Sequence, residues 1–404
     1  MSLRIAKLFI AAVLAAFSLA GCLNSGKSAA PPTTGLTLVP GDGQVTVSWD
    51  MTPGVEYWLF YAPASSISTS NWSSVPGARA VMNVTSPYSL TGLANGFTYS
   101  FTLNGRIDGG PGGAGTPSVS AVPRLAGNVW SAGSPLGAST LRGAMFGGSH
   151  IAAGLGGTMY SSSDGKSWTP LSAVTSKDLY AAAYGNGVYL AGGAGGTLLT
   201  STDGKTWSVQ ASTSTNDLYA IASNRTNLNV AVGAHGTILT STDGKTWSAA
   251  ANSATVSDLY GVAYSNGTGT WVAVGAAGTL LTSTDGGTWK AVASGTSADL
   301  KGVAYFPTAG AGAFVAVGAS GTLVTSPDGV TWTLQPALTT ATLNAVIYGS
   351  QYVAVGTNGT VLTSVDGITW LAQVSGTVSD LYAIEHALFS YSAVGAVGAN
   401  VYSQ

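Results

Sequence analysis

The feature that most constrains the fold is a set of seven tryptophans that recur at a nearly constant interval. Successive members of the set lie 38, 39, 40, 42, 43 and 38 residues apart. A period near forty residues is typical of a four-stranded blade in a β-propeller. The spacing therefore predicts a repeat protein built from seven small sheets. The seven residues are Trp130, Trp168, Trp207, Trp247, Trp289, Trp332 and Trp370.

A single repeat shows the order of strands expected for such a blade. The turn Asp243-Gly244 lies between its last two β-rich segments. Asp-Gly is a strong hairpin signal, because both turn positions favour positive φ. The four predicted strands of this repeat span residues 218–222, 229–232, 237–241 and 246–248.

Six Asp-Gly turns each lie in a Ser-x-Asp-Gly-x-(Ser/Thr)-Trp string, as in residues 201–207. The string resembles the Asp-box, or BNR, repeat of sialidase-like and photosystem-assembly-factor-like propellers. The usual box has one residue between the aspartate and the glycine, whereas the two are adjacent here, so the turn is one residue tighter. The resemblance implies that the aspartates bind amides of their own turns and that the tryptophans pack on the sheets, which are structural roles. The aspartates are Asp164, Asp203, Asp243, Asp285, Asp328 and Asp366.

The predicted blades also indicate how the array closes. Six complete blades start at leucines, and a seventh that starts at Leu381 has only three predicted strands. Residues 128–131 form an isolated predicted strand ahead of the first blade. We therefore predict an all-β propeller of seven blades over residues 127–404, closed by pairing of its N- and C-terminal strands, which removes exposed sheet edges.

Residues 35–123 carry short alternating strands between turn signals. The segment resembles a fibronectin type III domain, a small β-sandwich. Trp49 matches the core tryptophan of the second strand, and Leu93 and Tyr99 match the tyrosine-corner region, in which the hydroxyl bonds to upstream backbone. We expect this sandwich to act as a spacer.

The first residues are typical of an export signal. Arg4 and Lys7 precede an apolar stretch that ends in Leu-Ala-Gly-Cys22. This end resembles a bacterial lipoprotein signal, so residues 1–21 are predicted to be removed and Cys22 to be lipidated. Residues 22–34 are interpreted as a flexible tether. Leu23 follows the cysteine in place of an aspartate, which by resemblance to lipoproteins of two-membrane bacteria favours the outer membrane.

Composition excludes several classes of function. Only 7% of the residues are charged and the net charge is −2. Nucleic acid is not an expected partner, because phosphate binding requires a basic face. Cys22 is the only cysteine, so the mature chain is expected to contain no disulfide. We expect a monomer that holds no cofactor.

The resemblance to sialidases does not extend to their chemistry. Those enzymes hold the substrate carboxylate with three arginines, whereas the propeller segment contains only Arg142 and Arg225. Glu385 is its only glutamate, so no paired carboxylates of the glycosidase kind are evident. The three histidines, His150, His235 and His386, lie in different blades without metal-ligand spacing, and we predict no catalytic or metal site.

The remaining candidates are positions that vary within the repeat. The residue after each blade's first leucine and an aspartate before five of those leucines are expected to ring one mouth of the channel, as an amphipathic rim for stacking and hydrogen bonding. The alternative is that the tyrosines fill gaps between blades and the aspartates bond neighbouring amides. A varying position in the second turn of each repeat is expected on the same face. The rim candidates are Arg142, Tyr180, Tyr219, Tyr260, Lys301, Asn344, Tyr382, Asp178, Asp217, Asp258, Asp299 and Asp380; the turn position holds Gly195, His235, Ala277, Ser320, Asn358 and Val397.

Three functions remain open from the sequence. The favoured interpretation is a non-enzymatic, lipid-anchored envelope protein that binds a protein or glycan partner with its propeller face. The second is a carbohydrate-active enzyme of the envelope, a hydrolase or lyase, with Glu385 near Tyr382 and His386 as its weak support. The third is a purely structural surface repeat.

Overall fold

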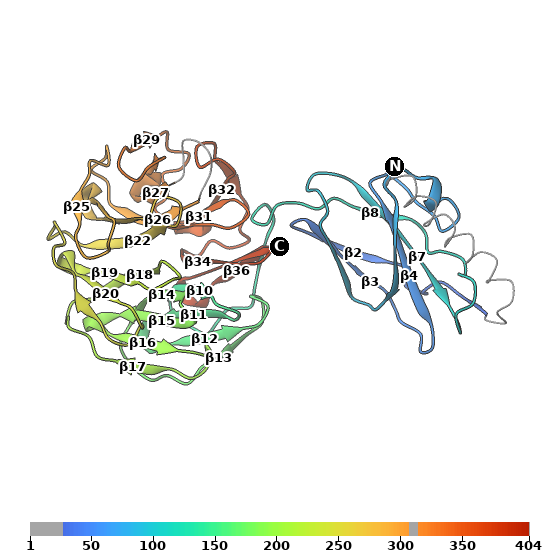
Figure 1. Ribbon diagram of the computed structural model, residues 1–404, viewed down its shortest axis with the longest axis horizontal. Helices are drawn as coiled ribbons and strands as arrows, with labels where there is room; N and C mark the ends of the chain where they lie inside the picture. Colours follow the sequence, from blue (N-terminus) through green and yellow to red (C-terminus); the bar gives the residue numbers. More distant parts are fainter. Residues whose placement is uncertain (1–26, 307–313, 404) are drawn as a thin grey trace, which may run out of the picture. The chain divides into compact units, whose positions relative to one another are not determined.

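The computed structural model describes residues 27–306 and 314–403, so the predicted signal peptide and Cys22 lie outside the described residues. Every regular element in these ranges is a β-strand or a short 3-10 helix. The chain divides into two compact units, with the boundary between Leu125 and Ala126 (Figure 1). In the described ranges, no helix has the length and apolar character needed to traverse a bilayer.

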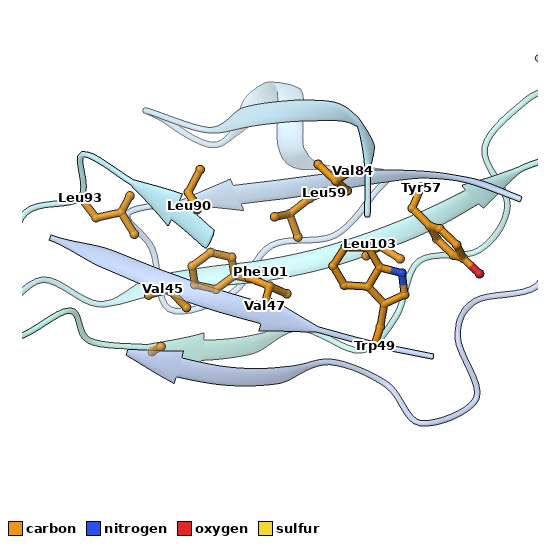
Figure 2. Close-up of a cluster of buried hydrophobic side chains, with 11 residues drawn as sticks. Val45, Val47, Trp49, Tyr57, Leu59, Val84, Leu90, Leu93, Phe101 and Leu103 are labelled. Atoms are coloured by element: carbon orange, nitrogen blue, oxygen red, sulfur yellow. The ribbon is translucent and has the colours of Figure 1, made fainter. Parts of the chain in front are cut away.

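The first unit is a sandwich of two β-sheets. One sheet has the strand order β1-β7-β4-β5 with β8 paired to β7, and the other has the order β2-β3-β6. Inward-facing residues of both sheets form one core (Figure 2), in which Trp49 meets the ring of Tyr57 edge-on at 5.7 Å. The Tyr99 hydroxyl accepts a hydrogen bond from the upstream N–H of Ala94 at 3.2 Å, the contact expected of a tyrosine corner. The elements are β1 (Ser28–Ala29), β2 (Thr37–Gly41), β3 (Gln44–Ser48), β4 (Glu56–Ala62), η1 (Trp72–Ser74), β5 (Arg79–Val84), β6 (Tyr88–Thr91), β7 (Tyr99–Arg106) and β8 (Val119–Ala121).

The segment before the sandwich is attached to it, so the prediction of a flexible tether over residues 22–34 is wrong for its second half. Strand β1 pairs with β7. The backbone N–H groups of Thr33 and Thr34 each donate to a carboxylate oxygen of Asp50 at 3.1 Å. The hydroxyl of Thr33, followed by that of Thr34, holds the pKa of Asp50 far below its usual range. The sequence pattern missed this contact because Asp50 lies beyond the next two strands.

The second unit contains seven four-stranded antiparallel sheets. The first strands of neighbouring sheets contact one another around the complete ring, including β34 with β10. The predicted seven-bladed propeller is therefore confirmed (Figure 1). The first strands, numbered as blades 1 to 7, are β10 (Leu141–Phe146), β14 (Leu179–Gly185), β18 (Leu218–Ser223), β22 (Leu259–Ser265), β26 (Leu300–Tyr305), β30 (Leu343–Tyr348) and β34 (Leu381–Ala387).

The second strands are buried along their length, because neighbouring blades cover both faces. They are β11 (His150–Gly154), β15 (Val188–Gly193), β19 (Asn229–Gly233), β23 (Thr270–Gly275), β27 (Phe314–Gly318), β31 (Tyr352–Gly356) and β35 (Ser390–Gly395). The third strands are β12 (Met159–Ser162), β16 (Leu198–Ser201), β20 (Ile238–Ser241), β24 (Leu280–Ser283), β28 (Leu323–Ser326), β32 (Val361–Ser364) and β36 (Asn400–Ser403). The fourth are β13 (Trp168–Pro170), β17 (Ser208–Gln210), β21 (Ser248–Ala249), β25 (Lys290–Ala291), β29 (Thr333–Gln335), β33 (Leu371–Gln373) and β9 (Trp130–Ala132).

The ring closes where β9, at the start of the propeller, pairs with β36 near its end. Trp130 lies opposite Ser403 in this antiparallel pair, and Ala132 lies opposite Val401. Strand β9 thus supplies the fourth strand of blade 7. The predicted pairing of the two terminal strands is what the structure contains.

Each Asp-Gly turn is held by its own side chains, as blade 2 illustrates. The Asp203 carboxylate accepts from the N–H groups of Lys205 at 2.8 Å and Thr206 at 2.7 Å. Ser201 accepts from the N–H of Gly204 at 2.9 Å. The same aspartate and serine contacts recur in the other five turns, so all six carboxylates are engaged locally.

Candidate functional site

The candidate rim is built from backbone irregularities in the seven first strands. In every blade the pairing between first and second strands shifts register directly after the first leucine, for example between Leu218 and Ala220. The residue between these two, Tyr219 in this blade, has no paired residue on the second strand. A bulge of this kind redirects a side chain away from the sheet. The seven bulged residues are Arg142, Tyr180, Tyr219, Tyr260, Lys301, Asn344 and Tyr382.

These seven side chains come together at one end of the channel, as the sequence predicts. They line a cavity of about 340 Å³, to which Asp258 also contributes. A second cavity of about 220 Å³ lies against the same residues and the small residues that follow them, such as Gly143, Ala182 and Gly302. The rim therefore leads into a narrow bore whose wall, beyond the rim residues, consists of glycine, alanine and the aliphatic side chains of Ile221, Val262, Val303, Val346 and Ile384.

The tyrosines of blades 2, 3 and 4 form a continuous arc. The ring centroids of Tyr180 and Tyr219 are 5.8 Å apart, and those of Tyr219 and Tyr260 are 5.6 Å apart, both pairs tilted by 45°. Cations lie over two rings of the rim: Lys301 over Tyr260 at 3.7 Å, and Arg142 over Tyr382 at 4.3 Å. Such contacts stabilise both partners and fix the position of each charge.

The two rim cations differ in their electrostatic surroundings. Lys301 forms an ion pair with Asp299 at 2.9 Å. The N–H of Ala277, and next the Lys301 ammonium, lower the pKa of Asp299, so this carboxylate is ionised at neutral pH. Within the described residues, no carboxylate lies within ion-pair distance of Arg142. Burial raises the pKa of Tyr180, Tyr219 and Tyr260, so their hydroxyls stay protonated.

The five aspartates beside the rim connect neighbouring blades. Each carboxylate accepts a hydrogen bond from a backbone N–H in the second turn of the preceding blade, at 2.7 to 2.9 Å. All five therefore make the contact of the alternative interpretation, bonding to neighbouring amides, and Asp258 also lines the rim cavity. The pairs are Asp178 with Gly156, Asp217 with Gly195, Asp258 with His235, Asp299 with Ala277, and Asp380 with Asn358.

The varying turn position has a structural explanation as well. Its six members have φ between 51° and 61°. Four of the six N–H groups, those of Gly195, His235, Ala277 and Asn358, reach aspartates beside the rim, which places this position on the rim face, as expected. Two junctions lack the aspartate: Thr140 precedes Leu141, and Thr342 precedes Leu343. The backbone N–H group at the turn position belongs to Val397 at the junction with Thr140 and to Ser320 at the junction with Thr342.

Glu385 does not face the rim. Its Oε1 atom lies 2.6 Å from Nδ1 of His150, and both side chains are almost completely buried between blades 7 and 1. Burial raises the pKa of Glu385, and the hydrogen bond from His150 opposes that shift. The spacing of the three histidines in the sequence does not predict this contact between His150 and Glu385. The position of Glu385 argues against a catalytic role, because a buried carboxylate between blades cannot meet a polysaccharide.

The repeat alignment contains the signal for this pair. Glu385 stands where other first strands have Met145, Ala183 or Ile347, and His150 stands where other second strands have aromatic residues such as Tyr189. One unusual residue in each of two adjoining blades is the pattern expected of a contact. Among the described residues, no group of three or more His, Cys, Asp or Glu side chains is arranged to hold a metal ion.

Comparisons with known proteins identify the fold. No family model matches this chain, and no curated protein matches its sequence. A structure of YCF48 bound to D1 peptide is similar with a TM-score of 0.56 and 21% identity, covering 70% of this chain and 99% of that chain. YCF48 from Cyanidioschyzon merolae gives a TM-score of 0.55 and 17% identity, covering 68% of this chain and 98% of that chain. At this identity the likeness shows the propeller fold alone.

Proposed function

We propose that this chain is a non-enzymatic binding protein that takes an extended segment of a protein partner on its propeller rim. The observation that carries the proposal is the arc of Tyr180, Tyr219 and Tyr260 with cations held at both sides. Tyrosine and arginine are the residue types that contribute most at protein interfaces. The tyrosine rings are partly exposed, so a partner can still cover them.

The charge of the rim favours a partner with an acidic group. Asp299 already neutralises Lys301, whereas Arg142 is exposed and without a carboxylate in the described part of the chain. A guanidinium held over an aromatic ring is ready to form a charge-assisted, two-pronged hydrogen bond with a carboxylate. That YCF48 is bound to a peptide in a structure of the same fold supports a peptide ligand here.

The test measures partner capture by the rim. Proximity labelling on intact cells names neighbouring proteins, and overlapping peptides from them are then titrated with the purified chain. Joint substitution of Tyr180, Tyr219, Tyr260 and Tyr382 by alanine is expected to weaken binding about 100-fold, because hot-spot aromatics contribute about 1–2 kcal/mol each and are not additive. Val209→Ala and Leu371→Ala, on exposed fourth-strand positions, are matched controls.

Glycans are tested with the same proteins, because tyrosine faces also stack on sugar rings. If a glycan array retains the wild-type chain and not the rim variant, the ligand is a glycan and the peptide proposal fails. If every identified partner binds the rim variant with unchanged affinity, the rim is not the binding site. Cleavage of a polysaccharide that Glu385→Gln abolishes would instead establish an enzyme.

The proposal includes a lipid anchor at Cys22 and export to the outer membrane of the cell envelope. It rests on the charged, apolar and small-residue segments that precede Cys22. Incorporation of a labelled fatty acid into the wild-type chain, and its loss in Cys22→Ser, would support the anchor. A wild-type chain that carries no lipid and retains residues 1–21 would contradict it.

A further inference from the structure

A second set of rings lies at the opposite end of the first strands, four residues beyond each bulged position. At about 3.3 Å per residue, this end is ~13 Å from the rim. Each ring packs on a ring near the start of its own blade's second strand, with centroids 4.7 or 4.8 Å apart. The set, which we call the lower ring, consists of Phe146, Tyr184, Tyr264, Tyr305, Tyr348 and His386.

The lower ring is interrupted in blade 3, where Ser223 occupies the equivalent position. In blades 2 and 7 a glycine of the preceding blade makes room for the ring. A Cβ atom on Gly147 would lie 2.2 Å from the ring of Tyr184, and one on Gly349 would lie 2.2 Å from the ring of His386. Gly185 is the corresponding glycine in front of Ser223, and a Cβ atom on it would meet the Ser223 side chain, so a hydroxymethyl group takes the place of the ring here.

A pocket of about 540 Å³ lies beside this interruption, and its lining includes Gly185 and Arg225. Phe146, Tyr184, His386 and Leu388 supply its apolar and aromatic wall, and the glycine-rich turns of blades 1 and 2 expose backbone to it. This pocket takes its residues from blades 7, 1, 2 and 3 and shares none with the rim cavity.

Two polar side chains of the pocket have unused hydrogen-bonding capacity. Arg225 is exposed, and no carboxylate in the described ranges lies within ion-pair distance of it. Both polar atoms of the Asn186 amide are buried and have no hydrogen-bond partner among the described residues. A cation beside aromatic faces is complementary to an anion that carries a flat apolar body.

We propose that this pocket is a second ligand site, separate from the rim, for a small aromatic carboxylate. The Arg225 guanidinium binds the carboxylate, and Phe146 and Tyr184 contact the ring of the ligand. The Asn186 amide pairs with a polar substituent such as a phenolic hydroxyl.

The experiment titrates the full chain with 4-hydroxyphenylacetate and with its neutral amide, followed by ligand-observed NMR. We expect the carboxylate to bind at least tenfold more tightly than the amide, because only the carboxylate forms a charge-assisted bond with Arg225. Arg225→Gln is expected to remove this preference. Ser223→Tyr, which adds the missing ring over Gly185, is expected to abolish binding of both probes.

Lys290→Gln, an exposed cation on β25 outside both cavities, is the matched control and is expected to leave both affinities unchanged. The proposal is overturned if the two probes bind equally, if Arg225→Gln has no effect, if Lys290→Gln removes binding, or if neither probe binds at about 10 mM. If Ser223→Tyr fails to fold, Arg225→Gln alone tests the proposal, because the Arg225 side chain lies on an exposed turn. Partner binding at the rim is measured in the same variants, so failure here is distinguishable from failure of the proposed function.

Discussion

The Oγ atom of Ser403 accepts a hydrogen bond from the backbone N–H of Gly127 at 2.8 Å, across 276 positions of the sequence. In an uninterrupted turn the same bond joins Ser201 to Gly204. The indole N–H of Trp130 in turn donates to the carbonyl of Gly127 at 2.6 Å. One Asp-Gly-type turn is thus divided between the two ends of the propeller, and blade 7 is fastened by the same serine, glycine and tryptophan contacts as the others.

Removal of the closing tryptophan should open the ring. Trp130 is 7% exposed and packs in a core with Tyr391 and Val401. We expect Trp130→Ala to destabilise the propeller by about 3 kcal/mol, the range found for large-to-small changes in cores. The loss in free energy of unfolding is measured on the full chain by denaturant unfolding and by calorimetry. Ser131→Ala, an exposed neighbour on the same strand, is the control, and equal effects of the two variants would contradict a closure role for Trp130.

A sixth inter-blade link can be added by design. Ser320 occupies the donor position at the junction of blades 5 and 6, where Thr342 stands in place of the aspartate found at five junctions. We expect Thr342→Asp to accept from the Ser320 N–H and to stabilise the propeller by about 1 kcal/mol, typical of one such hydrogen bond. The gain in denaturant midpoint should disappear in Thr342→Val. A destabilised Thr342→Asp would contradict this link, because the backbone N–H of residue 342, which donates to the Thr357 hydroxyl, is kept in every variant.

The sequence predicts the strands because their signals are local. Leucine, tryptophan and Asp-Gly recur at fixed offsets, and Trp130 alone marks the strand that closes the ring. The bulge after each leucine is not evident, because it depends on the register of two strands and not on residue type. For the same reason the sequence leaves open whether Asp217 faces a ligand or the N–H of Gly195. Glu385 and His150 are 235 positions apart, and only the ring makes them neighbours.

Acid should destabilise the propeller. The N–H groups of Thr288 and then Gly287 lower the pKa of Asp285 to about 2, and the other five turn aspartates are also shifted below their ordinary value. Since these pKa values are lower in the folded chain, the unfolded chain takes up protons first. The stabilisation is therefore complete above about pH 5 and is lost as the pH falls through 4 toward 2. Melting temperatures measured across this pH range give the loss of stability. Asp285→Asn should make the melting temperature depend less steeply on pH, whereas Asp108→Asn, in the sandwich, should not.

The hydrogen-bonded pair of Glu385 and His150, between blades 7 and 1, provides the last prediction. Oε2 of Glu385 has no hydrogen-bond partner in the described residues, so burial of this carboxylate is incompletely compensated. At the next seam, Met145 and Tyr189 occupy the equivalent places in an apolar cluster. Removing one partner from a buried pair leaves an uncompensated charge, and we expect His150→Tyr alone to destabilise the chain by about 3 kcal/mol.

Replacing both partners should have the opposite sign. His150→Tyr combined with Glu385→Met copies the neighbouring seam. We expect the free energy of unfolding of this double variant to equal that of the wild-type chain or to be higher by about 1–4 kcal/mol, as for other buried pairs replaced by apolar residues. Because burial raises the pKa of Glu385, the wild-type chain loses stability as the pH rises from the unfolded value through the folded one. The advantage of the double variant should therefore widen above pH 4.5. A double-mutant cycle from urea titrations measures the coupling, and affinity for the rim partner should not change, since neither residue lines the rim cavity.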